Sequence, residues 1–198
     1  MGLCIYYSGC INKGAFLPEL INEVQDIAEI YKWNYTIFRK QFPVDSFEKE
    51  SHDGEIYGIV FSPPNCEPVF ITFLSNGKMS SPVNLETFGK DSNEARRKYV
   101  YQLAVKTQYA GIHTHKLIIH LFRHLNDRYF QNFEMTDEGQ YWETGDEELL
   151  QQMFDRYNRL MENFASALES YPMSEGETFE SYFQRLIEQI NKRKGRSS

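Results

Sequence analysis

The sequence predicts an α+β fold, in which a mainly antiparallel β-sheet carries helices on one face. Three observations favour this class. The chain opens with a strand-like, a helical and a second strand-like segment, turn signals separate the strand-like segments in the middle, and amphipathic helical patterns close it. Hairpin connections produce antiparallel neighbours, and separate helices then cover one face of the sheet. With 198 residues, of which 41% are hydrophobic, the chain is long enough to bury a core without disulfides or metals.

The first half of the chain alternates between strand-like and helical patterns. Apolar residues recur at spacings of three and four from Leu17 to Tyr31, which predicts an amphipathic helix. Residues 43–54 are polar and predict a surface loop. The dipeptide Asn76-Gly77 predicts a tight type I′ hairpin. The strands predicted around these features are 3–7, 34–38, 56–61, 68–74 and a return strand at about 78–85.

The second half begins with a predicted strand at 99–106, followed by a long helix that ends near Phe130. The tripeptide Asp137-Glu138-Gly139, between two β-prone segments, predicts a three-residue hairpin. Residues 144–147 and 174–177 match the capping box, in which a hydroxyl residue precedes a glutamate by three positions. They predict helices at about 146–169 and 177–192.

The predicted elements divide into a single α+β domain at 1–170 and a C-terminal helical appendage with a basic tail at 171–198. The early strand–helix–strand order, the antiparallel middle and the long helix resemble the helix-grip and TBP-like arrangements. This resemblance concerns topology and implies no function.

Composition excludes several classes of protein. The 21 basic and 28 acidic side chains give a net charge of −7, which disfavours nucleic acid as a partner. The sequence lacks the run of about 20 apolar residues that would span a bilayer, and its first residues lack the pattern of a signal peptide. We therefore expect a cytoplasmic protein that does not bind membranes. The three cysteines form no CxxC motif, and we expect no cofactor.

Two histidines in the predicted long helix are candidate metal ligands. His120 and His124 are four residues apart and therefore share one face of the helix, with Asp127 about one turn further on. Imidazole and carboxylate groups are common zinc ligands. This face is the polar one, however, so the alternative is a pair of solvated histidines. We therefore predict no specific metal at this position.

His115 falls on the apolar side of the same helix, shortly after Lys106 and Gln108. A strand that ends in Lys-Thr-Gln and turns into a helix brings a lysine close to free backbone N–H groups. Such a turn favours an anion or a polar ligand. The alternative is an ordinary strand-to-helix turn with a hydrogen-bonded core histidine.

A second cluster of polar and aromatic residues occupies positions 137–146. Carboxylates with different pKa values can perform general acid–base catalysis. Turn formation and helix capping are the structural alternatives. If the two segments meet, Lys106, Gln108 and His115 share a pocket with Glu138 and Glu143. The candidates in this second cluster are Asp137, Glu138, Tyr141, Trp142 and Glu143.

The segments KTQYAG (106–111) and DEGQYWETGD (137–146) resemble a bacterial family of proteins of similar length, to which no activity is assigned. The resemblance extends over residues 98–165. It implies that the two segments belong to one type of domain, and it implies no catalytic residue.

These observations favour a binding or protein-interaction domain, whose partner is another protein or a second copy of the chain. The high aromatic content (15%) suits an interface. The alternative is a hydrolase-type enzyme that uses a histidine–carboxylate site between residues 106 and 146.

Overall fold

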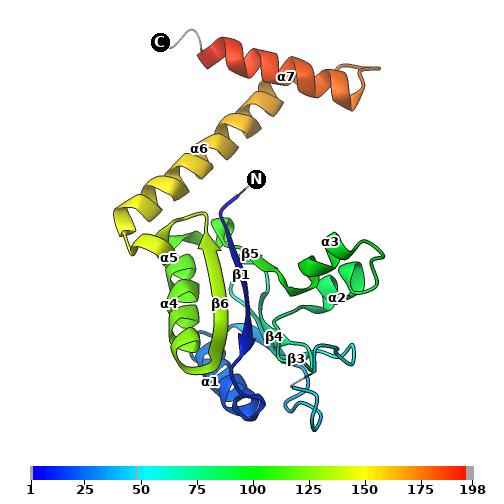
Figure 1. Ribbon diagram of the computed structural model, residues 1–198. Coiled ribbons are helices and arrows are strands. Elements are labelled where there is room, and N and C mark those ends of the chain that lie inside the picture. The colour runs from blue at the N-terminus through cyan, green and yellow to red at the C-terminus, as the bar shows by residue number, and fades with distance from the viewer. Residues whose placement is uncertain (1, 48, 195–198) are drawn as a thin grey trace. The chain divides into compact units, whose positions relative to one another are not determined.

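The computed structural model of the chain describes residues 2–47 and 49–194. The chain divides into two compact units, Met1–Phe154 and Asp155–Ser198. The first unit contains two three-stranded antiparallel sheets together with helices, which confirms the expected α+β class (Figure 1).

The first sheet has the strand order β5-β1-β6. Its central strand β1 (Cys4–Ile11) pairs antiparallel with β5 (Leu103–Lys106) and with β6 (Phe130–Asp137). The strand β1 continues four residues beyond the predicted strand. It places Ile5 opposite Val105 on one side and opposite Asp137 on the other.

The second sheet has the order β2-β3-β4, with β2 (Asn34–Ile37), β3 (Tyr57–Ser62) and β4 (Val69–Phe73). The prediction of one sheet was therefore wrong, because the strands before and after the first helix belong to different sheets. Residues 77–79 connect the two. Ile11 N–H donates to the carbonyl of Gly77 (2.9 Å), and Met79 N–H donates to that of Gly9 (2.8 Å).

Two long helices cover these sheets, as their apolar spacing predicted. The helix α1 (Leu17–Ile30) contacts β2 and β3, and α4 (Gly111–Tyr129) runs beside β6 (Figure 1). Phe122 of α4 lies 4.6 Å from the ring of Tyr7 on β1, measured between centroids. The core therefore lies between α4 and one face of the first sheet, while Tyr6, Ala104 and Thr136 are exposed on the other face.

The Asn76-Gly77 turn forms, but with another geometry. The Leu74 carbonyl accepts a hydrogen bond from Gly77 N–H, and Leu74 N–H donates one to the Lys78 carbonyl (both 2.9 Å). These two bonds close a three-residue loop. Only Gly77 in this loop has a positive φ (79°), whereas a type I′ turn needs two such residues.

The predicted return strand at 78–85 is absent. After isolated bridges at Lys78 and Met79, the chain enters the helix α2 (Pro82–Phe88). Ser81 caps this helix by accepting a hydrogen bond from Asn84 N–H (3.1 Å), and Pro82 occupies its first turn. This combination favours a helix start.

The predicted strand at 99–106 is shorter in the structure. The short helix α3 (Glu94–Arg97) and the 3₁₀ turn η2 (Lys98–Tyr101) precede β5, and the 3₁₀ turn η3 (Gln108–Ala110) follows it. A third 3₁₀ turn, η1 (Gly14–Phe16), precedes α1.

The predicted hairpin at 137–139 was also wrong. The strand β6 ends at Asp137, and residues 141–144 form the short helix α5 (Tyr141–Thr144) rather than a strand. The reason is the Asp137 carboxylate, which accepts hydrogen bonds from backbone N–H groups at the start of α5.

The helix α6 (Glu147–Ser170) begins where the sequence predicted, but its cap is Asp146 rather than Thr144. Asp146 Oδ1 accepts hydrogen bonds from Glu148 N–H (2.9 Å) and Leu149 N–H (3.0 Å). The second unit contains α6 from Asp155 onward and the helix α7 (Phe179–Lys194), whose Tyr182 and Leu186 are buried. The last four residues of the basic tail lie outside the described residues.

Across residues 2–47 and 49–194, the helices are either too short or too polar to span a membrane.

Candidate functional site

The polar centre of the first unit is a buried histidine–aspartate pair. His115 Nε2 lies 3.0 Å from Asp137 Oδ2, and both side chains are completely inaccessible to solvent. On the other side of the ring, Nδ1 lies 2.7 Å from Thr107 Oγ1. Thr107 directly follows β5, His115 lies in the second turn of α4, and Asp137 ends β6. The structure therefore brings together the segments 106–115 and 137–146, whose proximity the sequence alone did not establish.

The Asp137 carboxylate also organises the backbone around it. Its oxygens accept hydrogen bonds from the N–H groups of Gly139 (2.7 Å), Tyr141 (2.8 Å) and Trp142 (3.2 Å). Burial alone would raise the pKa of Asp137, but the hydrogen bond and charge of His115, together with those N–H groups, hold this pKa below its ordinary value. Asp137 is therefore ionised and saturated with donors.

Close packing separates this pair from solvent. A Cβ atom at Gly139 would lie 3.1 Å from His115 Nε2 and 2.6 Å from Leu150 Cδ1. The ring of Phe154 approaches the imidazole edge-on at 5.6 Å. A general base must come within hydrogen-bond distance of the proton that it removes, and these contacts leave His115 no room for a substrate.

The two neighbouring glutamates bind backbone groups. Glu143 Oε1 accepts a hydrogen bond from Asp137 N–H (3.0 Å), and Glu138 Oε2 accepts one from Cys4 N–H (2.8 Å). Both candidate carboxylates therefore belong to the same region as His115, but they fix the ends of β6 and β1.

Tyr141 and Trp142 are held by Arg123, a residue of α4 that the sequence did not single out. Arg123 Nη2 donates to the carbonyl oxygens of both residues (2.9 Å each), and its guanidinium lies over both rings. Trp142 also contacts Phe133 edge-on. These contacts account for the position of the tryptophan among acidic residues.

Lys106 and Gln108 lie beside the backbone of Gly2. A Cβ atom there would lie 2.3 Å from Lys106 Cε and 2.4 Å from Gln108 Oε1. The Lys106 ammonium lies 4.9 Å from the centre of the Tyr109 ring. Gln108 is only 4% exposed, and neither polar atom of its side chain has a hydrogen-bond partner in the described structure.

The candidate metal ligands have separate protein partners. His120 Nε2 lies 3.3 Å from the hydroxyl of Tyr141, whereas His124 Nε2 contacts Glu23 on α1. Asp127 is exposed. Within the described residues, no three histidine, cysteine, aspartate or glutamate side chains are arranged to hold a metal ion.

The open face of the first sheet carries a groove of about 450 Å³. Its floor includes Tyr6, which is 46% exposed and lies between Ala104 and Thr136 in the sheet register. Phe88 and Tyr99 line one side, and Glu134 lies opposite Ser8 in the register. The alternation of side chains along β1 could have identified Tyr6 as a surface residue, because its neighbours Ile5 and Tyr7 point into the core.

In comparisons with known proteins, no family model, no curated protein and no solved structure matches the chain. The functional argument therefore depends on the geometry of the chain itself.

Proposed function

We propose that this protein is a cytoplasmic protein-interaction domain, and that its groove on the β5-β1-β6 sheet binds a basic segment of a partner protein. The single observation that carries this proposal is the exposed ring of Tyr6 in the middle of an uncovered sheet face, with the carboxylate of Glu134 nearby. Among the described residues, the side-chain carboxylate of Glu134 has no hydrogen-bond or ion-pair partner, while its backbone lies in the β1–β6 ladder.

The chemistry of the groove suits a cationic side chain. An arginine or lysine is attracted to the face of an aromatic ring and to a carboxylate. Burial, and then the charges of Cys4 and Glu138, raise the pKa of Tyr6 to about 12, so its ring stays neutral near pH 7. The net charge of −7 further favours a basic partner. It also disfavours a second copy of this acidic chain.

A hydrolase that uses His115 and Asp137 is the second candidate. The observation in its favour is that Thr107, His115 and Asp137 are in contact one after another, which joins a hydroxyl, an imidazole and a carboxylate. A nucleophile needs access to its substrate, and Thr107 and His115 are both 0% exposed. The open groove therefore supports binding better than this buried triad supports catalysis.

The test uses two fluorescein-labelled peptides, one that contains arginines and one in which citrulline replaces them. Fluorescence anisotropy of the full chain should show binding of the arginine peptide. Tyr6→Ala should weaken that binding about fivefold, because a cation–π contact contributes about 1 kcal/mol. Tyr6→Phe, which keeps the ring, should bind within about twofold of the unchanged protein.

Glu134→Gln should weaken binding of the arginine peptide and leave any binding of the citrulline peptide unchanged. The matched control is Asp26→Asn, which removes one exposed carboxylate from α1. Equal binding of both peptides, or an equal effect of Glu134→Gln and Asp26→Asn, would contradict the proposal.

A further inference from the structure

A second and larger cavity lies in the first unit, between α2 and the residues that flank β2 and β3. Its volume is about 1000 Å³. Phe38 and Arg39 line it directly after β2, residues 52–56 line it before β3, and Pro82 and Leu85 line it from α2. The function proposed above does not use this cavity.

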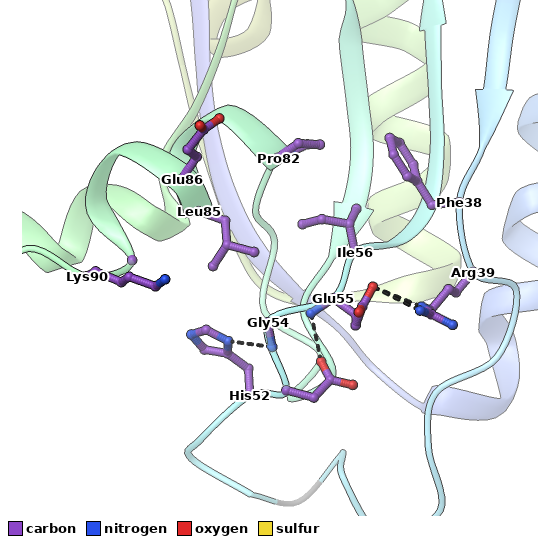
Figure 2. Close-up of a pocket in the computed structure, with 12 residues that line it drawn as sticks. Phe38, Arg39, His52, Gly54, Glu55, Ile56, Pro82, Leu85, Glu86 and Lys90 are labelled. Carbon is purple, nitrogen blue, oxygen red and sulfur yellow. Dashed lines mark hydrogen bonds and ion pairs between the residues drawn. The ribbon is translucent and has the colours of Figure 1, made fainter.

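The inner surface of the cavity is apolar. Ile56 belongs to a buried cluster with Leu74 and Val100, against which Phe38 and Leu85 pack. Figure 2 shows Leu85 and Ile56 facing one another across the cavity. Small-molecule sites are concave and mostly apolar, with a few polar groups that orient the ligand, and this cavity has that construction.

The acidic side chains of the rim either bind other protein groups or point away from the cavity. Glu55 forms a salt bridge with Arg39 (3.0 Å). Asp53 accepts hydrogen bonds from the Tyr57 hydroxyl (2.6 Å) and from Glu55 N–H (3.0 Å). The Glu86 carboxylate points away from the cavity in Figure 2.

Besides Arg39, which is paired with Glu55, two side chains of the rim carry hydrogen-bond donors. In Figure 2 the side chains of Lys90 and His52 both extend toward the cavity. His52 Nδ1 accepts a hydrogen bond from Gly54 N–H (3.2 Å), so the ring proton is on Nε2, which is free to donate. Among the described side chains, neither Lys90 Nζ nor His52 Nε2 has a partner.

We propose that this cavity binds a small organic carboxylate with an aromatic or other apolar body. The body would occupy the space between Phe38, Ile56 and Leu85, and the carboxylate would accept hydrogen bonds from Lys90 Nζ and His52 Nε2. A singly charged carboxylate matches Lys90, the one unpaired ammonium among the described residues of the rim, whereas a doubly charged phosphate would bury a second negative charge without a cationic partner.

The probe is 2-naphthoate, compared with 2-naphthalenemethanol and 2-naphthylmethylammonium, which keep the ring system and change the charge. Binding is followed in the full chain by the ¹H–¹⁵N NMR signals of Gly54 and Gly89, two glycines that line the cavity. The naphthoate should shift both signals saturably, and the alcohol and the ammonium should bind at least about fivefold more weakly.

Two variants assign this preference to the rim. Lys90→Gln removes the positive charge, and His52→Asn keeps an acceptor for Gly54 N–H while removing the Nε2 donor. Each should lower the affinity for naphthoate about fivefold and leave that for the alcohol unchanged. Lys32→Gln and His113→Asn, at other exposed positions, are the matched controls. Equal affinities for the three probes, no shift of Gly54 and Gly89, or equal losses in the controls would each overturn the proposal.

Discussion

His115 and Asp137 form a completely buried pair, with 3.0 Å between His115 Nε2 and Asp137 Oδ2. The pair joins α4 to the end of β6, and the remaining acceptor capacity of the carboxylate fixes the first residues of α5. A residue pair that resembles part of a catalytic site therefore acts as a structural connection between three elements.

Replacing the Asp137 carboxylate should lower the stability of the fold. In Asp137→Asn one oxygen becomes an NH₂ group, which cannot accept the hydrogen bonds that Asp137 accepts from His115 and from backbone N–H groups. We expect a loss of about 3 kcal/mol in the free energy of unfolding, measured by urea denaturation. The control Asp127→Asn, at an exposed position of α4, should change it by less than about 0.5 kcal/mol. Similar losses in both variants would contradict the structural role.

The contribution of Asp137 should depend on pH with a defined sign. The pKa of Asp137 in the folded state lies below its ordinary value, so the unfolded chain binds a proton more readily at this position. The stabilisation is therefore fully present above about pH 4, the ordinary aspartate pKa, and is lost as the pH falls through the folded-state value. We expect the difference in unfolding free energy between the unchanged protein and Asp137→Asn to decrease steadily below pH 4. A difference that stays constant to pH 2 would oppose this account.

Burial periodicity explains why some elements were predictable from sequence. In α1 and α4 the apolar residues repeat at helical spacing, and the structure buries those residues. The same reasoning placed His115 on the buried side of α4. For α2 the signals were present in Ser81 and Pro82, but the Asn-Gly dipeptide before them favoured a return strand.

The candidate site was less predictable, because distant residues determine it. Asp137-Glu138-Gly139 is equally compatible with a hairpin and with a helix start. The choice depends on His115, 22 positions earlier. The function of Arg123 likewise appears only when Tyr141 and Trp142 lie against α4. Such contacts have no local pattern in the sequence.

The absence of a side chain at Gly139 should be essential to the packing around His115. In Gly139→Ala the new methyl group would lie 2.6 Å from Leu150 Cδ1, so Leu150 or the backbone must move. We expect a loss of about 2 kcal/mol. Leu150→Ala alone should cost about 3 kcal/mol because it leaves a cavity. If the methyl group fills part of that cavity, the double variant should be at least about 1 kcal/mol more stable than the sum of the single losses. Strict additivity would contradict the contact.

Arg123 should hold α5 against α4. Its guanidinium donates to the carbonyl oxygens of Tyr141 and Trp142 and lies over both rings. In Arg123→Gln the shorter neutral side chain cannot maintain both contacts, so the backbone amides of α5 should exchange with deuterium at least about tenfold faster, since the lost hydrogen bonds contribute more than about 1.4 kcal/mol.

The matched control is Arg128→Gln, also on α4, which removes the ion pairs with Glu19 and Glu23 on α1. It should leave exchange in α5 unchanged, because these partners lie on another helix. Fluorescence of Trp142, measured in a Trp33→Phe background, gives a second observation. Its emission should shift to longer wavelength in Arg123→Gln alone, as the half-buried indole becomes exposed. Unchanged exchange and emission in that variant would show that α5 is held by Asp137 without Arg123.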